Sequence, residues 1–115
     1  MQYLLLIYEE QRRGEATPED GERMMAAYGA YGQWLRDKGW LRGGEALADV
    51  ADATTVQVRD GRRIITDGPF AETKEVLGGY FLIEAPDLDS AIEAAERLPG
   101  AQTGKVEIRP IVEMP

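Results

Sequence analysis

The sequence of 115 residues contains no cysteine and no histidine. Without cysteine it forms neither disulfides nor Cys-based zinc sites, and thiol catalysis is excluded. Without histidine it lacks the usual general base at neutral pH and the commonest metal ligand. Any catalysis must therefore use carboxylates, lysine, tyrosine or arginine. We expect no metal site and no cofactor.

Positive charge is also scarce, since 13 basic residues face 21 acidic ones and the net charge is −8. Such a balance argues against nucleic acid and against an anionic membrane surface as partners. Long apolar runs are absent as well. The run Leu4–Ile7 is too short for the core of a signal peptide, and no segment approaches membrane-spanning length. We expect a cytoplasmic protein.

What is present suits one globular domain over residues 1–115, with 43% hydrophobic and 30% charged residues. Residues 2–8 predict a strand that is apolar on both sides and therefore central in its sheet. Thr17-Pro18-Glu19-Asp20 predicts a helix start, and Gly39 predicts its end. Gly29 and Gly32 inside that helix are expected to allow close approach to the sheet.

The second half continues with short strands and a second helix. A strand is predicted over 40–47, and Asp60-Gly61 predicts a hairpin between 54–58 and 62–66, with a turn of two or three residues. Residues 79–84 predict another strand that is apolar on both faces. Asp87 is expected to cap a helix that ends at Pro99-Gly100, and a closing strand starts near Val106.

The order of elements predicts an α+β fold. Without the hairpin the order is βαββαβ, so we expect the ferredoxin-like split βαβ with an inserted β-hairpin. Two helices cover only one face of such a sheet, whereas the strands 2–8 and 79–84 are apolar on both. The uncovered face needs another layer, and we expect a homodimer through the sheet faces.

The most specific pattern lies in residues 65–80, which read Ile-Thr-Asp-Gly-Pro-Phe-Ala-Glu-Thr-Lys-Glu-Val-Leu-Gly-Gly-Tyr. Gly68 and Pro69 account for a turn after the strand, but turn chemistry does not require the residues that follow. Together they resemble the signature of the DGPF group within the YCII-related family of small stand-alone bacterial proteins. The resemblance implies the dimeric α+β barrel fold.

The signature loop is also the candidate site. Asp67, at a strand end, is the candidate catalytic acid or base. The candidate substrate-binding residues are those of the loop and two tyrosines of central strands: Gly68, Pro69, Phe70, Glu72, Thr73, Lys74, Glu75, Tyr8 and Tyr80. The competing interpretation is structural, with Asp67 as a turn cap, Phe70 filling the core and the loop charges in solvent. We expect the cleft to lie between the loop, the first helix and the sheet.

Two functions stay open. The wider family resembles the muconolactone isomerase type of fold, where a His–Asp pair suggests an active site. This chain has only the aspartate, matched by Asp67 through the signature, so that mechanism does not carry over. The resemblance allows a small-molecule-binding dimer, with a cofactor-free isomerase-like or oxygenase-like reaction. The alternative is a non-enzymatic accessory or regulatory protein linked to an extracytoplasmic-function sigma factor.

Overall fold

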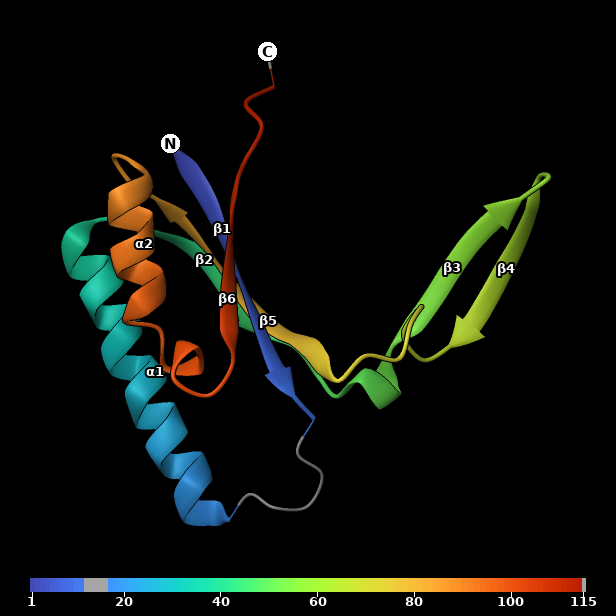
Figure 1. The fold of residues 1–115 in the computed structure, drawn as a ribbon, viewed down its shortest axis with the longest axis horizontal. Helices are drawn as coiled ribbons and strands as arrows, with labels where there is room; N and C mark the ends of the chain where they lie inside the picture. The colour runs from blue at the N-terminus through green and yellow to red at the C-terminus, as the bar shows by residue number, and fades with distance from the viewer. Residues whose placement is uncertain (12–16, 115) are drawn as a thin grey trace.

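The computed structural model describes residues 1–11 and 17–114, which form a mixed α and β fold with antiparallel sheets and two helices. The main sheet has the strand order β2-β5-β1-β6. Its strands are β1 (Gln2–Glu10), β2 (Leu41–Ala46), β5 (Glu75–Glu84) and β6 (Lys105–Pro110). Helices α1 (Pro18–Lys38) and α2 (Leu88–Glu96) lie together on one side of it (Figure 1). The α+β expectation is confirmed.

The other elements are two short 3-10 helices and a separate hairpin. The 3-10 helices are η1 (Val50–Asp52) and η2 (Pro99–Ala101). The hairpin consists of β3 (Thr54–Arg59) and β4 (Arg62–Asp67), which pair only with each other. No helix among residues 1–11 and 17–114 has both the length and the apolar character needed to span a membrane.

Both helix starts are those that the sequence predicts. The Thr17 hydroxyl accepts a hydrogen bond from the Asp20 backbone N–H, and the Asp20 carboxylate accepts one from the Thr17 N–H. This reciprocal capping box satisfies two of the N–H groups that a helix start leaves without partners. Asp87 caps α2 through one such bond, since its carboxylate accepts from the Ser90 N–H at 2.8 Å. Gly39 ends α1 in the left-handed conformation, with φ of 75°.

The core lies between the helices and one face of the sheet. Its fully buried side chains include Leu5, Leu35, Ile83 and Leu98. Burial of each such side chain stabilises the fold by roughly 2 kcal/mol. Some apolar side chains of the helices remain exposed, among them Met24 in α1 and Leu88 and Ile92 in α2.

The helix glycines do not have the role expected of them. A Cβ atom placed on Gly29 would meet nothing within 4 Å, and one on Gly32 would meet only the end of the Arg36 side chain. Neither position brings α1 close to the sheet, so that expectation is wrong.

The register divides the sheet into two apolar faces. Residues that lie directly opposite each other on neighbouring strands share a face. Tyr3 and Leu5 face the helices together with their partners on β5, Ile83 and Phe81. The opposite side, called here the open face, carries Leu4, Leu6, Tyr8, Leu77, Tyr80 and Leu82, and at the β6 edge Lys105, Glu107 and Arg109. No helix covers the open face among the described residues.

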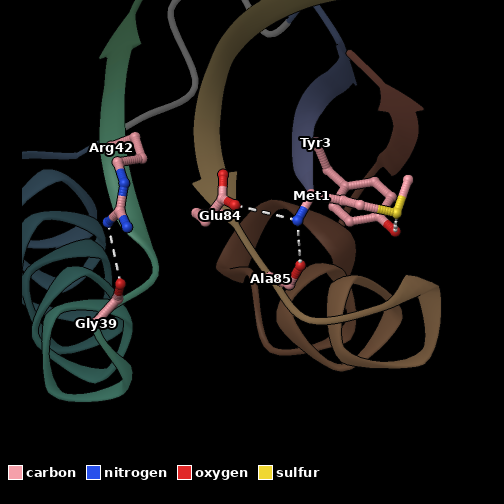
Figure 2. A network of polar contacts seen from close by, with 6 residues as sticks. All are labelled: Met1, Tyr3, Gly39, Arg42, Glu84 and Ala85. Carbon is pink, nitrogen blue, oxygen red and sulfur yellow. Dashed lines mark hydrogen bonds and ion pairs between the residues drawn. The ribbon is translucent and has the colours of Figure 1, made fainter. Parts of the chain in front are cut away.

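A polar network closes the end of the sheet that lies far from the signature loop (Figure 2). The amino group of Met1 donates to the Glu84 carboxylate at 3.1 Å and to the Ala85 carbonyl at 3.0 Å. Nearby, the Arg42 guanidinium donates to the Gly39 carbonyl at 3.0 Å. These contacts fix the start of β1 to the end of β5 and the end of α1 to β2.

The β3–β4 hairpin projects from the molecule and is called here the arm (Figure 1). Arg59 pairs with Arg62, so the turn contains two residues, Asp60 and Gly61, both with positive φ. Positive φ at both turn residues is typical of the type I′ hairpin turn. Because the arm projects, the radius of gyration is 16.3 Å, compared with roughly 13 Å for a compact chain of this length.

Candidate functional site

The signature loop leaves the base of the arm and enters β5. Gly68 has a φ of 94°, which favours glycine there. Its N–H donates to the Ala53 carbonyl at 2.7 Å, and its carbonyl accepts from the Thr55 hydroxyl at 2.8 Å. Thr55 therefore holds the turn. Sequence reasoning missed it, because a threonine within a strand carries no signal of such a contact.

Asp67 lies at the end of β4 with an exposed side chain. Within the described residues its carboxylate has no hydrogen-bond or ion-pair partner. It is therefore not a turn cap. Nor is it covered by apolar side chains in a single chain, since it is exposed to solvent.

Phe70 is 88% exposed. The competing interpretation, in which this ring fills the core, is therefore wrong. An aromatic ring so exposed beside a polar loop is available to a ligand or to a second chain.

Two ion pairs lie where the loop enters the sheet. Lys74 Nζ lies 3.3 Å from the Glu10 carboxylate, and Lys105 pairs with Glu75. The Thr73 hydroxyl donates to the Glu75 carbonyl at 2.6 Å. Glu75 belongs to β5 rather than to the loop, because β5 starts four residues earlier than the sequence predicts. Glu10 and Lys105 were not among the predicted site residues.

Three shallow concave regions lie at this end of the sheet, and the second and third share Glu75 and Lys105. The first, of about 460 Å³, contains the predicted residues Pro69, Glu72 and Thr73. The second, of about 320 Å³, contains Lys74 and Glu75 together with Glu10 and Lys105. The third, of about 500 Å³, is lined by Tyr8, Glu75, Lys105, Val106 and Glu107.

These regions bring most of the predicted site residues to one end of the sheet, but they exclude four of them. Asp67, Gly68, Phe70 and Tyr80 line none of the three. Tyr80 lies further along the open face, opposite Leu6. Helix α1 also lines none of them, so among the described residues these three regions do not form the expected cleft between the loop, the first helix and the sheet.

A larger concave region, about 990 Å³, lies on the opposite, helix-covered side. It runs between α1 and η2 and includes Tyr31, Trp34 and Arg97 but no predicted site residue. Arg97 already has partners: its guanidinium lies 4.6 Å from the Trp34 ring centroid and 3.7 Å from the Glu93 carboxylate. Next to it, burial and then the charge of Glu9 raise the pKa of Tyr28, which keeps that phenol neutral.

Metal binding gains no support from the geometry. In residues 1–11 and 17–114, no three acidic side chains lie close enough together to hold an ion. Two pairs of one lysine and one glutamate, Lys74 with Glu10 and Lys105 with Glu75, lie there instead.

Comparison with known proteins places the chain in a family. The family model for the YCII-related domain matches residues 1–115. The chain belongs to the YCII-related family. A relative with 36% identity over 114 residues is an uncharacterized protein of Rhizobium meliloti (strain 1021); the match covers 96% of this chain and 92% of that protein.

One solved structure is similar at a lower level. It is 5-chloro-2-hydroxyhydroquinone dehydrochlorinase from Burkholderia phenoliruptrix AC1100, in complex with 2,5-dihydroxybenzoquinone. The match has 16% sequence identity and a TM-score of 0.49, and it covers 99% of this YCII-related chain and 96% of that one.

Proposed function

We propose that this YCII-related chain is a homodimer that binds a small polar molecule where the open face meets the signature loop. The proposal depends on one observation. Tyr8, Glu75, Lys105 and Glu107 come from three adjacent strands, and they line one concave region of about 500 Å³. A hydroxyl, an ammonium and two carboxylates that share one hollow are the polar groups that a small-molecule site needs for orientation.

The strand order supports a fold in which this site becomes enclosed. With the arm set aside, the order is β1-α1-β2-β5-α2-β6, which is the βαββαβ of a ferredoxin-like fold. The apolar side chains of the open face, among them Leu4, Leu6 and Leu82, favour a second sheet packed against them, as in a dimeric α+β barrel. Such packing encloses the loop end of the sheet and leaves the groove beside α1 in solvent.

The charges of the site indicate the class of ligand. Both lysines are solvent-accessible and each is paired with a glutamate, Lys74 with Glu10 and Lys105 with Glu75. An organic acid or an acidic phenol can replace either glutamate as the partner of the ammonium group. The displaced carboxylate is then available to accept a proton, which is the chemistry that a cofactor-free isomerase-like reaction requires.

One observation favours the alternative, a non-enzymatic accessory protein. In a single chain the three concave regions are shallow, and Asp67 and Lys74 do not meet. An enzyme needs these groups to converge, whereas a protein that only recognises a partner does not. Ligand binding separates the two functions.

The experiment is native mass spectrometry of the purified protein, followed by thermal-shift titration with a panel of small carboxylic acids and phenols. Binding should raise the melting temperature of the wild type. Lys105→Gln should lower the affinity for the same compound by about tenfold or more. Lys38→Gln at the far end of α1 removes the same charge and should leave the affinity unchanged. Absence of a stabilising compound and of a co-purified ligand, or equal loss in both variants, would contradict the proposal.

A further inference from the structure

The arm has one apolar face. In its register Val56 lies opposite Ile65, Val58 opposite Arg63 and Thr54 opposite Asp67. Side chains alternate between the faces of a strand, so these residues share one side, called here the arm's apolar face. The other side carries Thr55, Gln57, Arg59, Arg62, Ile64 and Thr66 and is mainly polar.

Nothing in the described part of the chain covers the apolar face. Val56, Val58 and Ile65 are 57%, 70% and 52% exposed, although valine and isoleucine prefer buried positions. Strands β3 and β4 make their extensive contacts only with each other. A single two-stranded hairpin is marginally stable in water. The arm therefore needs a surface to lie against.

The distribution of charge along the chain indicates that this surface belongs to a second copy of the chain. Residues 54–67 contain three arginines and two aspartates, a balance of +1, while the whole chain carries −8, so the remainder carries −9. The three arginines, Arg59, Arg62 and Arg63, lie at the tip that reaches farthest from the sheet (Figure 1). A basic tip on an acidic body is attracted to another copy of that body.

Geometry adds a second argument for the same occupant. The arm is rooted between η1 and the signature loop, at the end of the sheet where β5 starts, and it extends away from its own core (Figure 1). The molecule measures 47 × 47 × 18 Å, which is a flat shape. A two-fold pairing through the open faces places both arms beside the partner's body, so each copy receives one arm and supplies one.

We propose that the arm docks on a second copy of this chain, with Val56, Val58 and Ile65 packed against the partner. This inference rests on the homodimer of the proposed function and goes beyond it. The homodimer of the proposed function needs contacts between the open faces only. The present inference adds the two arms to that interface.

Docking of the arm would also bring Asp67 into the interface. Its side chain is on the apolar face, at the base of the arm. When a partner covers that face, the carboxylate leaves the solvent that surrounds it in the single chain. The candidate site of one copy is then completed by its neighbour, which explains why Asp67 lines none of the concave regions of one chain.

The test measures dimerisation and protection of the arm together. Sedimentation equilibrium gives the dimer dissociation constant of the wild type, of Val56→Asp and of Gln57→Asp. These two positions are adjacent on β3, face opposite sides and acquire the same new charge. Val56→Asp should raise the dissociation constant by more than about tenfold, because Val56 lies opposite Ile65 and the covered carboxylate would have no partner there. Gln57→Asp should change it by less than about threefold.

Hydrogen exchange of the wild type tests the same contact without any substitution. Amides of residues 54–67 should exchange more slowly at concentrations above the dissociation constant than below it. If the arm amides exchange as fast in the dimer as in the monomer, this inference is overturned, but the open-face dimer is not. Equal weakening of the dimer by the two variants has the same meaning. A monomer at every concentration overturns the inference and the proposed homodimer together.

Discussion

Tyr31 joins the two helices through one buried hydrogen bond. Its hydroxyl donates to the Ala94 carbonyl in α2 at 2.7 Å, and the side chain is buried in the core. Burial raises the pKa of this phenol far above its ordinary value, so the hydroxyl remains a donor over the whole working range of pH.

Replacement of Tyr31 by phenylalanine should therefore lower the free energy of unfolding by about 1 kcal/mol, the usual net value of such a bond. Urea unfolding at neutral pH measures it. Tyr28→Phe, at a half-buried position, should cost less. A Tyr31→Phe variant as stable as the wild type would show that the bond contributes nothing.

Asp87 makes the start of α2 sensitive to acid. The Ser90 backbone N–H and then its side chain donate to this carboxylate and hold its pKa below the ordinary value of 3.8. A lowered folded-state pKa stabilises the fold above the unfolded-state value, and that stability is lost as the pH falls through the folded-state value.

The melting temperature of the wild type should therefore fall as the pH drops below the ordinary value of 3.8. Asp87→Asn should show a smaller fall in acid, because asparagine caps without titrating. Asp89→Asn is the matched control, since Asp89 accepts no hydrogen bond from described residues and lies in the same turn. Parallel acid limbs for Asp87→Asn and the wild type would contradict this account.

At the scale of the element, replacing a glycine by alanine should have opposite effects on stability in α1 and next to β6. Gly29 lies inside a helix with open space around it, and Gly29→Ala should stabilise the protein by roughly 1 kcal/mol. A Cβ on Gly104 would overlap the carbonyl oxygen of Tyr8, and Gly104→Ala should cost more than about 2 kcal/mol. Thermal unfolding of both variants measures this, and the same sign for both would contradict it.

The elements that the sequence predicts correctly are those whose signals are local. Thr17 with Asp20, Asp87 with Ser90 and the Asp60-Gly61 turn each act within a few residues, and each has the expected geometry. The start of β5 was missed, because Glu75 pairs with Glu10 across the sheet and nothing near Glu75 in the chain indicates that pairing. Long-range contacts decide such boundaries.

The candidate site shows the same division. Its loop was recognisable from residues 67–75, but the partners of that loop were not. Lys105 reaches Glu75 across 30 positions of sequence, and Glu10 reaches Lys74 from the other end of the chain. Only the fold brings these groups together, and the exposed position of Phe70 likewise follows from the projecting arm rather than from its own residue type.

At the scale of the whole molecule, the flat shape and the uncovered open face lead to one prediction. Leu82 lies near the centre of that face, between Leu4 of β1 and Gly43 of β2. A dimer of ordinary stability buries more than about 1,000 Å² in total, and a flat apolar sheet face can supply that area. Leu82→Glu places a charge in the middle of it.

Sedimentation velocity at micromolar concentration should give a dimer for the wild type and a monomer for Leu82→Glu, because an unpaired charge at an interface centre costs several kcal/mol. Ile92→Glu, on the exposed side of α2, should remain dimeric, since that helix lies on the other side of the sheet. Circular dichroism should show both variants folded, because Leu82 is only partly buried in one chain. If Leu82→Glu sediments as a dimer, the copies meet through another surface, and the arm becomes the first candidate for it.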